Sequence, residues 1–205
     1  GYQTLNANTT GGNNTANGYQ ALRDNTTGAN NTAVGVNALI LNTTGTNNTS
    51  VGVNTLLNNN GSSNSAFGYG ALRFNQTAGS NSAFGDFALY ANTTGSLNSA
   101  FGQNSLTANT TGVNNTAIGQ ASLQSNTTGN YNTAIGVGSL LLNNADNNTA
   151  VGYSSLNQNT TGAANTALGR YSAQKNTTGN YNTSIGYNAN WYNSTGNNNT
   201  ALGFY

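Results

Sequence analysis

The stretch Asn31-Thr32-Ala33-Val34-Gly35 decides the fold, because its pattern recurs along the whole chain. Each copy reads Asn, then Thr or Ser, then Ala or Ser, then usually an apolar residue, then glycine. A period this short and strict is typical of a solenoid, in which each repeat forms one coil and packs only on its neighbours. The closing glycines are 17 residues apart, or 16 in two places, and are Gly18, Gly35, Gly52, Gly68, Gly85, Gly102, Gly119, Gly136, Gly152, Gly169, Gly186 and Gly203.

Two apolar columns appear when the coils are aligned on these glycines. The residue before the glycine is Val, Phe, Ile or Leu in every coil except the first, which has Asn17. Leucine stands four residues after the glycine until the last two coils, which have Ala173 and Asn190. Such residues predict two short strands per coil. We expect the two columns to meet inside the coil, with the small Ala and Ser columns forming flat outer faces.

An Asn-Thr-Thr-Gly segment is the predicted surface turn of each coil. The two shortened coils lose their residue within it, around residues 58–61 and 144–147. Solenoids accept changes of length in surface turns and not in core strands. We expect the glycine of this turn, as at Gly45 or Gly112, to adopt a positive φ.

Asparagine forms two further columns, which we place at the corners of the coil. Identical residues in stacked coils lie ~4.8 Å apart, and amides at that spacing can hydrogen-bond from coil to coil. The first column opens each pentapeptide and is the predicted structural ladder: Asn31, Asn48, Asn64, Asn81, Asn98, Asn115, Asn132, Asn148, Asn165, Asn182 and Asn199.

The second column stands seven residues after each glycine and reads as a series of N-glycosylation sequons. Asn59 and Asn143 keep the asparagine but lack Thr two residues on, which favours a role in the turn itself. An asparagine held in a ladder cannot also carry a sugar, so the two interpretations compete. The glycosylation candidates are Asn8, Asn25, Asn42, Asn75, Asn92, Asn109, Asn126, Asn159, Asn176 and Asn193.

Composition excludes several classes of function. Charged residues make up 3% of the chain and the net charge is +1, too little basic charge for nucleic-acid binding. No apolar run approaches the ~20 residues that span a bilayer, so we expect no membrane insertion. The chain has no His and no Cys, and Asp24, Asp86 and Asp146 fall in different columns. We therefore predict no enzyme activity, no cofactor and no metal site.

Tyr187, Trp191 and Tyr192 form the densest group of aromatic residues. They are candidates for a surface that stacks on a sugar or contacts a partner. The alternative is that they cover a weakened core, since Asn190 replaces leucine in the same coil.

The repeat resembles the head repeats of trimeric autotransporter adhesins and related tail-fibre repeats of bacteriophages. Asn115-Thr116-Ala117-Ile118-Gly119 and Asn132-Thr133-Ala134-Ile135-Gly136 carry the resemblance. It implies a left-handed parallel β-roll, with three chains side by side, displayed on a cell or virion surface. The present unit departs from that family in being longer and in having the Asn-Thr-Thr-Gly turn.

These observations predict an all-β chain, a parallel β-solenoid or β-roll of about twelve 17-residue coils, with two short strands in each. Residues 1–205 form one repeat domain, which we expect to be a segment of a longer fibre. The expected function is that of an extracellular structural or adhesive fibre that self-associates as a side-by-side homotrimer or a head-to-tail filament.

Two alternatives stay open. The first is an adhesin head or phage fibre tip that binds a host-surface glycan or receptor through the aromatic residues. The second is an ice-binding solenoid, in which a column of threonines such as Thr32, Thr116, Thr133 and Thr149 forms a flat, regular array.

Overall fold

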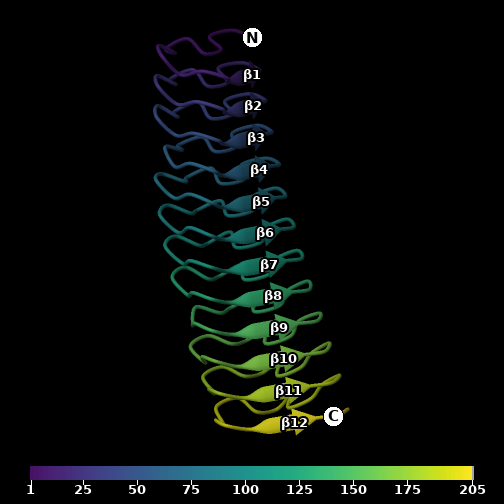
Figure 1. Ribbon diagram of the computed structural model, residues 1–205. Coiled ribbons are helices and arrows are strands. Elements are labelled where there is room, and N and C mark those ends of the chain that lie inside the picture. Colours follow the sequence, from purple (N-terminus) through teal and green to yellow (C-terminus); the bar gives the residue numbers. More distant parts are fainter. Residues whose placement is uncertain (205) are drawn as a thin grey trace.

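The computed structural model describes residues 1–204 as one stack of coils with its two termini at opposite ends (Figure 1). Twelve parallel strands form a single sheet in which each strand pairs with its neighbours in sequence. The predicted all-β parallel solenoid is confirmed. The strands are β1 (Thr15–Asn17), β2 (Thr32–Val34), β3 (Thr49–Val51), β4 (Ser65–Phe67), β5 (Ser82–Phe84), β6 (Ser99–Phe101), β7 (Thr116–Ile118), β8 (Thr133–Ile135), β9 (Thr149–Val151), β10 (Thr166–Leu168), β11 (Thr183–Ile185) and β12 (Thr200–Leu202).

The prediction of a second strand in each coil is wrong for the described residues, because the leucine segment forms turns. Leu89 has a φ of 51° and Phe87, two residues earlier, a φ of 58°. These alternating left-handed residues curl the chain. The conformation costs roughly 1–2 kcal/mol at a leucine. Complete burial of the Leu89 side chain offsets that cost by roughly 1.5–3 kcal/mol.

Hydrogen bonds between coils nevertheless continue through the leucine segment. The Leu89 amide donates to the Ser105 carbonyl at 3.0 Å, and the Ala91 amide donates to the Thr107 carbonyl at 3.0 Å. The coils are therefore bonded to one another well beyond the three residues of each strand.

The leucine column lies inside as expected, but the expected positions of the other apolar column and of the small columns are wrong. Within β7, Thr116 is half-buried, Ala117 is fully buried and Ile118 is exposed, and in every strand from β2 to β11 the middle residue is buried while its two neighbours are half-buried or exposed. The core therefore consists of the alanine column of the strands, the leucine column and a second small column just before the leucines. The coil is too narrow for two large columns to face each other, so the alanine methyl groups pack opposite leucine. The Val, Phe and Ile column consequently lies outside.

Glycine closes each strand because the backbone there is left-handed and close to the next coil. Gly102 has a φ of +132°, and a Cβ at this position would lie 2.7 Å from the carbonyl carbon of Gly119. The expectation of a positive φ at Gly45 and Gly112 is wrong, since neither has one. A Cβ on Gly45 would instead collide with the Gly61 carbonyl oxygen and with Asn42 Oδ1, so this glycine provides room for buried asparagines.

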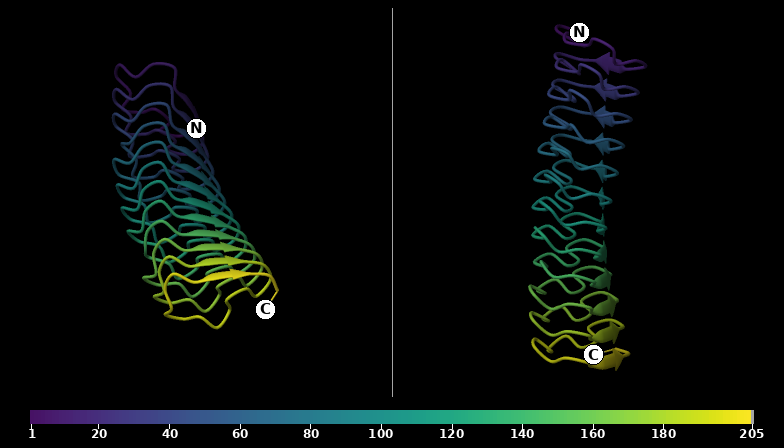
Figure 2. Two further views of the ribbon diagram at one scale, coloured as in Figure 1. Left: turned by 60° about the horizontal axis from the view of Figure 1, so that its bottom comes forward. Right: turned by 60° about the vertical axis from the view of Figure 1, so that its left-hand side comes forward.

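The stack is long and narrow, and its coils lie almost in line along the axis (Figure 2). The strands occupy one side, and just after each strand the chain reverses at a narrow corner, next to the closing glycine (Figures 1 and 2). Both faces of that corner are thus repeated from one end of the described chain to the other.

Candidate functional site

The first asparagine column forms a continuous buried ladder. The Asn48 amide nitrogen and Asn48 Nδ2 both donate to Asn31 Oδ1, at 2.9 and 3.1 Å. The bond from backbone nitrogen to Oδ1 is present in every successive pair from Asn14 to Asn199. Each asparagine side chain therefore caps the strand entry of the next coil.

The second column forms a ladder from side chain to side chain. Asn92 Nδ2 donates to Asn75 Oδ1 at 2.7 Å, and Asn109 Nδ2 donates to Asn92 Oδ1 at 2.8 Å. The ladder is interrupted at the second shortened coil and near the last coil, where the buried Oδ1 atoms of Asn126 and Asn176 have no partner among the described residues. The first shortened coil keeps the bond, since Asn59 Nδ2 donates to Asn42 Oδ1 at 3.2 Å.

The two columns converge on one carbonyl oxygen in each turn. The Gly95 oxygen accepts from Asn81 Nδ2 at 2.9 Å and from Asn92 Nδ2 at 2.8 Å. In two turns an alanine, Ala78 or Ala145, supplies the carbonyl instead. The shared acceptor ties the strand entry of one coil to the turn of the next.

This geometry bears on the glycosylation candidates. Asn25, Asn42, Asn75, Asn92, Asn109, Asn126, Asn159 and Asn176 are at most 2% exposed, and Asn8 and Asn193 in the outermost coils are half-buried. Each buried Nδ2 donates to its own turn carbonyl, and most donate also to the preceding asparagine. A sugar on one of these nitrogens in the folded chain would displace the ladder.

A different set of sequons, which is not among the predicted sites, has accessible asparagines. Asn30-Asn31-Thr32 is one example: Asn30 is exposed and lies in an exposed turn just before the ladder residue. In the sequence, two consecutive asparagines followed by Thr mark these sequons. The exposed members are Asn13, Asn30, Asn47, Asn114, Asn147 and Asn198.

Replacing a ladder asparagine tests how much the network stabilises the fold. Asn81→Ala removes the donor to Gly95 and the acceptor of the Asn98 amide. The Gly95 carbonyl keeps its bond from Asn92, so the Asn98 amide is the group left unpaired. An orphaned buried group costs about 1–3 kcal/mol, and we expect the free energy of unfolding to decrease by about that amount in urea titrations. Asn58→Ala, at a partly buried position, is the control and should change it by less than about 1 kcal/mol. Equal losses in both variants would contradict a special role of the ladder.

Of the three candidate aromatic residues, the structure brings Trp191 and Tyr192 together, with ring centroids 5.0 Å apart. Trp191 Nε1 donates to Gln174 Oε1 at 2.7 Å, and Lys175 Nζ lies 5.0 Å from the Trp191 ring. A hollow of about 300 Å³ beside them is lined by Asn188, Asn190, Trp191, Tyr192 and Asn193. Tyr187 is not part of this lining; it stacks on Phe204 at 5.3 Å.

Exposed apolar residues recur in what we name the outer stripe, the residues immediately before and after each closing glycine. It lies at the narrow corner of the coil and runs the length of the stack. Its exposed apolar members include Val34, Phe101, Ile118, Ile135 and Leu168 before the glycine, and Tyr19, Val36, Val53, Tyr69, Val137, Tyr153 and Tyr187 after it.

The outward residues of each strand compensate one another in size. In β4 to β6 phenylalanine is paired with serine, whereas threonine accompanies Val, Ile or Leu in β7 to β12. The three phenylalanine rings stack at 4.6 and 4.8 Å. The threonines proposed for an ice-binding array lie on this same face, but the serine and phenylalanine rungs interrupt the array.

Charge is sparse on this surface. Within the outer stripe the charged residues are Asp86, which follows β5, and Arg170, which follows β10. Both are exposed. Asp86 Oδ1 accepts from the Tyr69 amide at 2.8 Å, and the Arg170 guanidinium lies 4.7 Å from the centre of the Tyr171 ring.

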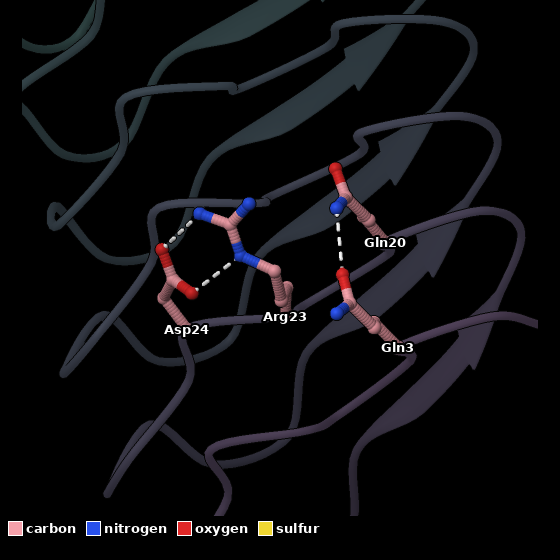
Figure 3. A network of polar contacts seen from close by, with 4 residues as sticks. All are labelled: Gln3, Gln20, Arg23 and Asp24. Atoms are coloured by element: carbon pink, nitrogen blue, oxygen red, sulfur yellow. Dashed lines mark hydrogen bonds and ion pairs between the residues drawn. The ribbon is translucent and has the colours of Figure 1, made fainter.

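A separate ion pair lies on the leucine side of the second coil (Figure 3). Arg23 Nε and an Arg23 terminal nitrogen donate to the Asp24 carboxylate at 2.6 and 2.7 Å. These hydrogen bonds hold the pKa of Asp24 below its ordinary value. Next to the pair, Gln20 Nε2 donates to Gln3 Oε1 in the neighbouring coil at 2.7 Å.

The pH dependence of stability follows from this pair. A carboxyl whose folded pKa is lowered stabilises the fold above its ordinary pKa, and this contribution is lost as the pH falls through the folded value. The chain has no histidine. We therefore expect thermal midpoints from circular dichroism to stay nearly constant between about pH 5 and 8 and to decrease below about pH 4. Asp24→Asn should reduce this acid-side decrease, and a midpoint that falls between pH 8 and 5 would contradict the assignment.

The described part of the chain contains no cluster of three or more potential metal-ligating His, Cys, Asp or Glu residues. It also contains no helix long and apolar enough to cross a membrane. No family model matches the chain, and comparison with curated proteins and with solved structures gives no match.

Proposed function

We propose that the protein is a segment of a stiff extracellular fibre that associates with further copies of itself. The observation that carries this proposal is the outer stripe, which is mostly apolar along the described chain and is interrupted after the glycine by Asp86, Gln103, Gln120 and Arg170. Monomeric soluble proteins rarely expose continuous apolar patches beyond a few hundred Å². A patch of this length favours a partner that repeats with the same period.

Stiffness is supported by bonding of the coils along the axis. Strand pairing, amide bonds through the leucine segment and two asparagine columns all link consecutive coils. Twelve coils at ~4.8 Å each give a rod about 58 Å long. Bending such a rod requires several of these columns to lengthen together on one side.

Extracellular display is supported by the resemblance of the repeat to the head repeats of surface adhesins and to phage fibre repeats. The low charge fits a structural role, because the surface offers no extended field to attract a nucleic acid or an anionic membrane.

Charges placed in the middle of the outer stripe test self-association. Ile118→Lys with Ile135→Lys puts two exposed lysines on adjacent strands. We expect the wild-type chain to associate with increasing concentration in sedimentation-velocity runs, and this variant to remain monomeric with an unchanged circular dichroism spectrum. Thr44→Lys with Thr111→Lys, at exposed turn positions, should associate like the wild type. A wild-type chain that is monomeric at all concentrations would contradict the proposed function.

A second candidate function is recognition of a glycan or receptor, and the hollow beside Trp191 favours it. An aromatic ring held by Gln174 and flanked by asparagine amides combines a stacking surface with hydrogen-bonding groups. Sugar-binding surfaces commonly need both kinds of group.

Replacing Trp191 and Tyr192 by alanine tests this second function. If the hollow binds a glycan, binding to a glycan array should be lost while the melting temperature changes by only a few degrees, since the site lies in the outermost coils. Tyr131→Ala, at another exposed tyrosine, is the matched control and should keep binding. Unchanged binding in the double variant would exclude the site.

A further inference from the structure

We propose that two copies of the chain pair antiparallel through their outer stripes, about a two-fold axis that crosses the stripe between β7 and β8. This inference rests on the proposed self-association and specifies its partner, surface and register.

The outward strand face and the stripe at its edge form the surface of this pair. The strands are three residues, roughly 10 Å, wide, and the ten rungs shared in this register span roughly 48 Å. The strand face thus gives roughly 480 Å² per chain, or roughly 960 Å² for the pair, to which the residues after the glycines add at the corner. This area lies at the lower end of the range for specific interfaces and favours a weak, reversible pair.

The positions of the two charges select the direction. In a parallel pair in register, Asp86 would lie beside the β5 rung of the partner. It would then meet either the partner's Asp86 or an apolar residue. A two-fold axis across the stripe instead brings the rung of β5 opposite the rung of β10 of the other chain. Asp86 then faces the partner's Arg170, and by symmetry Arg170 faces the partner's Asp86.

The same register also matches large side chains with smaller ones. The three phenylalanines that end β4, β5 and β6 come opposite Ile185, Leu168 and Val151, which end β11, β10 and β9. Ile118 comes opposite Ile135 at the centre. Asn17, the one polar residue that ends a strand, lies on β1, which the register leaves outside the overlap.

Both charged groups are placed to reach across such an interface. Asp86 uses Oδ1 to accept from the Tyr69 amide, which leaves Oδ2 for a partner's guanidinium. Arg170 is held on Tyr171 and Tyr153, with the Arg170 charge at 4.7 and 5.5 Å from the ring centres. Arg23 and Asp24, by contrast, already satisfy each other.

Exchange of the two charges tests the pairing. Asp86→Arg and Arg170→Asp should each weaken dimerisation by roughly tenfold or more, because like charges then meet twice in the symmetric pair. The double variant should recover most of the wild-type affinity in sedimentation equilibrium. Asp146→Arg and Lys175→Asp, which lie away from the stripe, are the charge-matched controls and should dimerise normally. Failure of the double variant to recover, with both single variants weakened, would overturn the register.

Single cysteines give an independent test, because the chain has none of its own. Ser99→Cys lies on β6 and Thr149→Cys on β9, which the proposed register places opposite each other. A short bismaleimide should crosslink a mixture of the two variants efficiently and each variant alone poorly. Efficient crosslinking of Ser99→Cys with itself would show parallel, in-register packing and overturn the antiparallel pair. It would leave the fibre proposal intact, whereas a monomer in every experiment would overturn both.

Discussion

The fold depends on hydrogen bonds from buried asparagine side chains to the turn carbonyls. A coil of about 17 residues encloses space for one leucine and the small residues around it, so it buries little apolar surface. The turn carbonyls point into this space, away from water, and an unpaired buried carbonyl costs about 1–3 kcal/mol. Two asparagine amides meet at each of these carbonyls and also reach the neighbouring coil. One of these amides belongs to the same turn and the other to the preceding coil, so stacking completes the bonding of the turn carbonyl and favours the stack over a single coil.

The sequence predicts this architecture because a strict period leaves few folds to choose from. It also indicates the polar columns, since asparagine recurs without exception even where the turn is shortened. It does not predict which columns face inward. Inside a strand the faces alternate, but Gly102 and its equivalents bend the chain and reset that alternation. Leucine also suggests a strand, whereas Leu89 and its equivalents are left-handed and buried, a combination that only the narrow core makes favourable.

The sequence also does not predict that the outer stripe is exposed, because it does not show which columns face inward. Phe67, Phe84 and Phe101 belong to the column expected inside from the sequence, and only the burial of the neighbouring alanines places them on the outside. The aromatic cluster at Trp191 was visible as a local density of rings. The hydrogen bond that orients Trp191 was not, because Gln174 lies one coil away and nothing in the sequence marks that glutamine as a partner.

A repeated surface poses a problem of register that an irregular surface does not. Each rung of the outer stripe resembles the next, so sliding two chains by one coil, ~4.8 Å, changes the apolar contact very little. A charge makes these registers unequal, because a charge buried in the interface without an opposite charge is costly. Two opposite charges five strands apart are sufficient to favour one offset and one direction. Scarcity of charge along the rest of the stripe then becomes a condition of specificity, because additional charges at every rung would allow further registers.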